Sequence, residues 1–234
     1  MSLDVYVGSL TRYFLRTWET EAQRWAREEG LTDQLVPPPD PLPAQEPLAV
    51  QRLVETWRNG IAAELADKVE CALDWDESEH APYFTGRPSW ACYGHLLLWA
   101  AYNEYPQATL PPGPVKHWEQ DPLYLRAAAG SKRYSQLLRG AVWWLPCDYD
   151  WMFLAEDPGG HERGIGSSVK LLAELEALNQ RTWKLSDAEL AQLRAGGTPR
   201  HGADLETGAR FSMALCTELA RLSVKHHLPY LLDF

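Results

Sequence analysis

The chain has 234 residues, 45% hydrophobic and 23% charged, which is an ordinary globular composition. Its 32 acidic and 22 basic residues give a net charge of −10, and this disfavours direct binding to nucleic acids and to anionic membranes, which both attract basic surfaces. No apolar run is long enough to cross a membrane, and the N-terminus lacks the pattern of a secretory signal, so we expect a cytoplasmic protein.

The first third of the chain predicts a strand followed by helices. In residues 3–7, apolar side chains alternate with polar or aromatic ones, which is typical of a short strand. Residues 17–29 are predicted as a helix that opens with a capping box. Residues 36–47 contain six prolines and are predicted to be a stiff, extended connector. From residue 47 to about residue 71, apolar side chains recur at helical spacing, which predicts a long amphipathic helix.

The rest of the chain predicts helices with a few short strands. The expected elements are an acidic loop at residues 74–80, a central helix at 88–102, a loop at 106–123, strands at 141–146 and 150–155, a glycine-rich turn at 159–166, a helix from about 168, helices at 186–195 and 204–226, and an edge strand at 228–234. Because strands and helices do not alternate regularly, a doubly wound parallel sheet is not expected. The sequence predicts a single α+β domain over residues 1–234, dominated by helices and containing a small, mainly antiparallel sheet.

The four cysteines show no metal-binding or redox spacing. Cys71, Cys92, Cys147 and Cys216 are far apart and include no CxxC pair. We therefore expect reduced, partly buried thiols rather than a disulfide framework. The sequence gives no reason to expect a metal site or a cofactor, and it does not predict an oligomeric state.

Acidic residues are concentrated in one short segment of the sequence. Residues 64–79 contain seven acidic side chains and one lysine. Such a cluster is most often a solvated surface, but it can also attract a basic protein. We therefore select five residues of this segment as candidates for partner binding: Asp74, Trp75, Asp76, Glu77 and Glu79.

Aromatic residues gather around two aspartates in residues 143–151. Tryptophan is the residue type that most often anchors protein interfaces, so Trp143 and Trp151 are candidate anchors for a partner. The same residues could line a ligand pocket. Alternatively, they simply pack in the core, as aromatic residues in strands usually do.

A glycine-rich segment at residues 159–168 supplies the alternative site. Glycines that precede a helix can expose backbone N–H groups to an anion, although the order of residues matches no known phosphate-binding motif. An enzyme or small-ligand-binding protein with a Trp-lined pocket near residues 143–168 would use these groups. Its candidate ligand-binding residues are Asp148, Asp150, His161, Gly164, Gly166 and Ser167.

The chain is acidic and rich in aromatic residues, and it carries none of the common catalytic motifs. In this general character it resembles small acidic bacterial immunity proteins, which neutralise a toxin by covering it. The resemblance implies a basic protein partner and transfers no residue. The leading hypothesis is a protein-binding module that inhibits a basic enzyme or toxin. Because it lacks catalytic motifs, the chain itself is not expected to be an enzyme.

Overall fold

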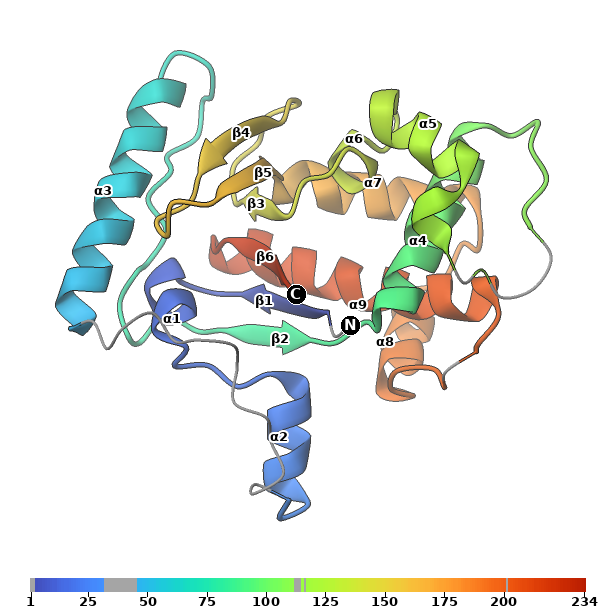
Figure 1. Ribbon diagram of the computed structural model, residues 1–234, viewed down its shortest axis with the longest axis horizontal. Helices are drawn as coiled ribbons and strands as arrows, with labels where there is room; N and C mark the ends of the chain where they lie inside the picture. The colour runs from blue at the N-terminus through green and yellow to red at the C-terminus, as the bar shows by residue number, and fades with distance from the viewer. Residues whose placement is uncertain (1–2, 32–45, 112–114, 116, 201) are drawn as a thin grey trace.

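The computed structural model describes residues 3–31, 46–111, 115, 117–200 and 202–234. Within these ranges the chain forms nine α-helices, one 3-10 helix and one six-stranded sheet (Figure 1). This confirms the predicted helix-dominated α+β fold. None of the helices in the described ranges combines the length and the hydropathy needed to span a membrane.

The sheet is mixed, with one parallel pairing among antiparallel ones. Only β3 and β5 run parallel, and the other four pairings are antiparallel. In sheet order the strands are β2 (Phe84–Gly86), β1 (Asp4–Val7), β6 (Tyr230–Asp233), β3 (Trp143–Leu145), β5 (Glu162–Ser167) and β4 (Phe153–Glu156).

Helix α9 (Leu205–His226) is the centre of the helical half. It packs against β1, β2 and β6 and against the helices α4, α7 and α8. Thirteen of its residues are buried, so it is enclosed on most sides. The helices of this half are α4 (Trp90–Glu104), α5 (Pro122–Gly130), α6 (Ser135–Leu138), α7 (Ser168–Arg181) and α8 (Asp187–Ala195), with the 3-10 helix η2 (Trp118–Gln120) between α4 and α5.

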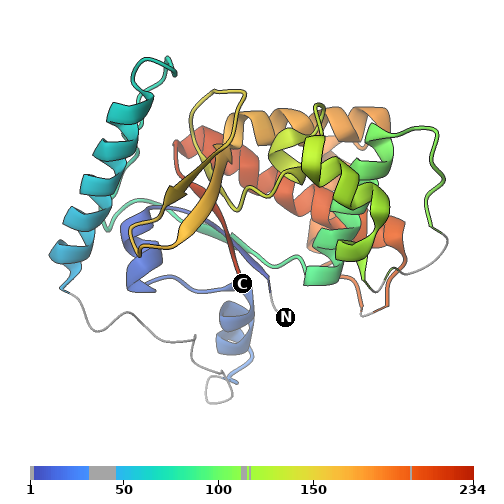
Figure 2. The same ribbon diagram turned by 45° about the horizontal axis from the view of Figure 1, so that its top comes forward.

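The other three helices are α1 (Leu10–Leu15), α2 (Glu21–Glu28) and α3 (Pro47–Leu65). In Figure 1, α1 and α3 lie toward the opposite end of the molecule, and α2 lies below the sheet. Helix α3 packs on α1 and runs alongside β4 in both views (Figures 1 and 2). Its apolar stripe of Val50, Val54, Ile61 and Leu65 is buried, as expected from the spacing.

Local signals located most helix starts correctly. Thr20 and Ser186 form the capping boxes of α2 and α8, Pro47 occupies the first turn of α3, and Ser167 caps α7. Helices α1, α5 and α6 were not expected. The predicted proline-rich connector lies outside the described residues, except for its last two positions.

Two sheet predictions are wrong. β6 is a central strand rather than an edge strand, because it lies between β1 and β3, and Tyr230, Leu231 and Leu232 are buried. Residues 162–167 form β5 instead of a turn. β5 separates β3 from β4, the strands found near residues 141–146 and 150–155.

Candidate functional site

The net negative charge of the chain is concentrated at one end of the molecule. Residues 46–80 hold nine acidic and three basic residues, and residues 148–163 hold five acidic residues and one basic residue. The remaining 18 acidic and 18 basic residues balance. The two segments meet where Trp57 Nε1 on α3 donates a hydrogen bond to the carbonyl of Glu156 on β4 (2.6 Å). We call these two segments together the acidic end.

The predicted acidic loop alternates between the core and solvent. The side chains of Trp75 and Glu77 are buried, with 2% and 5% of their surface exposed. Those of Asp74, Asp76 and Glu79 are exposed. The alternation arises because successive side chains of an extended segment point to opposite sides. Three of the five candidates in this loop are therefore available to a partner, and the prediction for the two buried ones is corrected.

Glu77 connects the acidic loop to helix α1. Its carboxylate accepts the backbone N–H groups of Leu10 (3.1 Å) and Thr11 (2.7 Å), and the Trp75 indole also donates to it. Burial raises the pKa of Glu77 above its usual range, and these hydrogen bonds oppose that rise. A helix N-terminus leaves N–H groups without partners and favours a negative charge, so Glu77 stabilises the fold. It does not steer a partner from this buried position.

A groove opens beside this loop. It has a volume of about 730 Å³ and lies between α1, the first turns of α3 and residues 77–80. Its apolar lining includes Leu15 and Leu48, and Leu48 is 64% exposed. Glu79 and His80 stand at its rim with most of their side chains in solvent. The groove therefore combines an exposed leucine with a solvent-exposed carboxylate.

Arg12 is the main basic group in the groove, and its guanidinium group already has partners within the protein. Its guanidinium donates to the carbonyl groups of Thr17, Glu79 and Ala81. It also stacks over the ring of Tyr83, 4.9 Å from the centroid. Arg12 therefore holds the two sides of the groove together.

The two predicted tryptophan anchors pack within the protein. Trp143 is 1% exposed and lies edge-on to Tyr13 and Trp57, with centroids 6.1 and 5.9 Å away. Trp151 is partly buried against Tyr149 and Phe153. All three residues of β3 are buried, so both faces of the sheet are covered at this strand. The predicted Trp-lined pocket is thus replaced by core packing, and Trp143 is not available as an anchor.

Asp148 and Asp150 share one lysine. Lys170 Nζ on α7 lies 2.9 Å from a carboxylate oxygen of each. Hydrogen bonds to Asp150 and Asp148 raise the pKa of Lys170 above its ordinary value. Both carboxylates are exposed, so this is a surface cluster, and such clusters contribute little to stability.

The glycines of the predicted ligand site serve the packing of β5. A side chain at Gly164 would meet the backbone of Gly140, and one at Gly166 would meet Gln136. The Ser167 N–H donates to the side chain of Gln136, and its hydroxyl caps α7 and donates to the carbonyl of Cys147. These groups are satisfied inside the protein, so they do not form a cradle for an anion.

His161 lies in the turn between β4 and β5, away from the Lys170 cluster. Its Nδ1 is 3.5 Å from the buried carboxylate of Asp157, which also binds Arg163 (2.8 Å). The six candidate ligand-binding residues therefore have different partners and do not converge on one ligand. A catalytic site built from them is not supported.

A disulfide joins the segment just before the acidic loop to the segment just after β3. Cys71 and Cys147 are bonded, with Cα atoms 5.8 Å apart, whereas Cys92 and Cys216 are buried free thiols. The expectation of four reduced cysteines is wrong. The spacing of 76 positions gave no sign of the pairing, because only the folded chain brings these residues together.

Comparisons of the chain with known protein families, with curated proteins and with solved structures found no match. The candidate functional site of this chain is the acidic end. Sequence reasoning overlooked Leu48 and Arg12 in its groove. Leu48 could have been noticed, because it lies two positions before Val50 and therefore off the buried stripe of α3. Arg12 carries no comparable signal.

Proposed function

We propose that this chain is a protein-binding module whose acidic end docks a basic protein. The observation that carries the proposal is the charge distribution: two segments far apart in sequence, whose residues sum to a net charge of −10, meet at one end of the molecule, and Asp74, Asp76 and Glu79 are exposed there. A predominantly acidic surface raises the rate of encounter with a partner of the opposite charge and disfavours acidic competitors.

The acidic end also has the apolar groups that an interface needs. Leu48 and Leu53 on α3 are 64% and 44% exposed, and Leu154 on β4 is 68% exposed. Charged residues at the rim of an interface affect mainly specificity and association rate, whereas apolar contacts at its centre supply much of the affinity. The partner class that fits this surface best is a basic enzyme or toxin, which the module would inhibit by covering it.

The test is capture of a partner by charge-reversed and control variants. Asp74→Lys/Glu79→Lys changes two exposed carboxylates of the acidic end. Glu28→Lys/Glu29→Lys makes the same change in net charge at two exposed residues at the C-terminal end of α2, outside the acidic end. Tagged wild-type protein is expected to retain a basic protein in a one-to-one complex from the lysate of cells that make it. The acidic-end variant should lose this partner, and the α2 variant should retain it.

Salt supplies the second arm of the test. Association measured with the purified partner should slow by about tenfold or more between 50 and 300 mM salt, because exposed charges are screened over a Debye length of about 10 Å at 0.1 M. The proposal would be contradicted by a captured partner whose association rate changes neither with salt nor with the Asp74→Lys/Glu79→Lys substitutions. Equal losses in the two charge-reversed variants would contradict it as well.

A further inference from the structure

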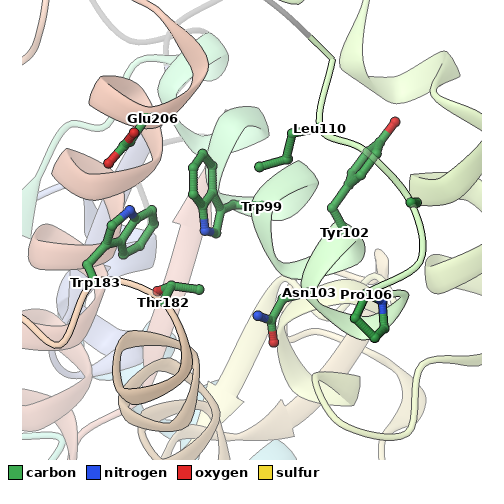
Figure 3. Close-up of a pocket in the computed structure, with 9 residues that line it drawn as sticks. Trp99, Tyr102, Asn103, Pro106, Leu110, Thr182, Trp183 and Glu206 are labelled. Atoms are coloured by element: carbon green, nitrogen blue, oxygen red, sulfur yellow. The ribbon is translucent and has the colours of Figure 1, made fainter.

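A second site lies at the end of the molecule away from α3. A cleft of about 350 Å³ opens between α4, the loop that follows it, the turn between α7 and α8, and the first turn of α9. Figure 3 shows the side chains around it. The residues that line it include Trp99, Tyr102 and Asn103 from α4, Thr182 and Trp183 from the turn, and Glu206 from α9. None of them belongs to the acidic end, so this site is independent of the proposed function.

Two indoles form the apolar part of the cleft. The ring centroids of Trp99 and Trp183 are 4.8 Å apart and the planes are inclined by 32°, and both residues are partly exposed. Trp99 follows the fully buried Leu98 on α4, so its position on the helix directs it out of the core. Indole surface in contact with water is costly, and a ligand with a flat apolar face would cover it.

Polar groups flank the indoles on two sides. On one side, the amide nitrogen of Asn103 and the indole nitrogen of Trp99 are directed toward Thr182 (Figure 3). The amide is oriented by Tyr134, whose hydroxyl donates to Asn103 Oδ1 (2.5 Å). On the other side, the Glu206 carboxylate lies beyond Trp183 (Figure 3). The cleft thus offers hydrogen-bond donors at one end and an acceptor at the other.

The charges of the cleft favour a neutral ligand. Glu206 is the charged side chain of its lining, and it lies 3.7 Å from Arg210 one turn further along α9. A carboxylate at the rim repels an anion. Since its charge is partly balanced by Arg210, it also offers little to an organic cation. A ligand with hydroxyl groups can instead accept from the donors and donate to the carboxylate.

We propose that this cleft binds a neutral saccharide. The C–H face of a pyranose ring would stack on Trp183 and Trp99, while its hydroxyl groups would bond with Asn103 at one end and Glu206 at the other. The volume of the cleft suits on the order of one or two sugar rings. This is a binding site of a different chemical class from the surface proposed for a basic protein.

The test starts with an array of neutral and charged glycans probed with the full-length labelled chain. The neutral glycan with the strongest signal is then titrated by calorimetry against variants. Trp183→Ala should weaken binding by about tenfold or more, because it removes a stacking face. Trp25→Ala is the matched control, since Trp25 is 58% exposed on α2, and it should leave the Kd unchanged.

Two further variants keep the test decisive if Trp183→Ala disturbs the fold. Trp183→Phe retains an aromatic face and should preserve most of the binding, whereas Glu206→Gln, at a half-exposed helix position, should weaken it by a few-fold. The proposal is overturned if no neutral glycan on the array binds, or if only anionic glycans bind. It is also overturned if a neutral glycan binds with a Kd that neither Trp183→Ala nor Glu206→Gln changes. Variants of the acidic end that no longer bind the protein partner should still bind the saccharide.

Discussion

Glu77 accepts the backbone N–H of Thr11 at 2.7 Å, across 66 positions of sequence. The same arrangement recurs at another short helix. Glu174 receives the backbone N–H groups of Gln136 (2.9 Å) and Leu137 (3.0 Å) at the start of α6. Short helices have few internal hydrogen bonds, so a carboxylate supplied from a distant segment stabilises their first turn and fixes where they lie.

The role assigned to Glu77 predicts a loss of stability on its neutralisation. Glu77→Gln places an amide N–H₂ against donors and removes the negative charge at the start of α1, so the free energy of unfolding should fall by about 1–3 kcal/mol. Asp76→Asn changes the neighbouring exposed carboxylate and should cost no more than about 0.5 kcal/mol. Urea unfolding followed by circular dichroism measures both. Equal effects of the two substitutions would remove the capping role.

The buried carboxyl group of Glu174 predicts that the free energy of unfolding depends on pH. Burial raises the pKa of Glu174 to about 7, against opposing hydrogen bonds from Gln136, Leu137 and Ser135. The folded state therefore binds the proton more tightly than the unfolded state does. Its contribution to stability is full below pH 4.5 and is lost as pH rises through about 7.

Unfolding measured from pH 5 to pH 8 should reveal this loss as a difference between two proteins. The wild type should lose about 1–2 kcal/mol more than Glu174→Gln over this range, because the variant lacks the titrating group. Parallel stability profiles for wild type and variant would contradict the raised pKa. The comparison uses slopes, so the hydrogen bonds that the substitution alters at all pH values do not affect it.

Two glycines in helices predict opposite responses to alanine. A Cβ at Gly94 on α4 would collide with the buried indole of Trp118, whereas one at Gly60 on α3 would meet nothing within 4 Å. Gly94→Ala should destabilise the protein by about 1–3 kcal/mol. Gly60→Ala should stabilise it by about 0.5–1 kcal/mol, because glycine is a poor helix former. Thermal unfolding that ranked the two substitutions in the reverse order would show that α4 and η2 pack differently.

The disulfide between Cys71 and Cys147 predicts sensitivity to reductants. It closes a loop of 76 positions, so its reduction should lower the free energy of unfolding by about 3–4 kcal/mol, through the greater entropy of the unfolded chain. Thiol alkylation and mass spectrometry should detect two free thiols in the denatured, unreduced protein and four after reduction. Cys92→Ala removes a thiol without touching the bridge and serves as the control for sensitivity to reductant. Four free thiols before reduction would rule the bridge out.

Much of the local structure follows from short-range signals in the sequence. The capping boxes at Thr20 and Ser186, Pro47 in a first turn and the apolar stripe of α3 all lie within a few positions of the helix they define. Hydrogen bonds and side-chain contacts over three or four residues depend on local geometry alone, so they can be predicted without knowing the path of the chain. The helix-dominated α+β class follows from the sum of these signals.

Everything that joins distant segments was decided by the tertiary structure. The acidic loop was visible in the sequence, but its division into buried Glu77 and exposed Asp76 depends on where α1 lies. The pairing of Cys71 with Cys147 and of Trp99 with Trp183 depends on chain topology as well. Contacts between distant residues form only when the core closes, because burial of apolar surface, which has no direction and no sequence range, brings those segments together.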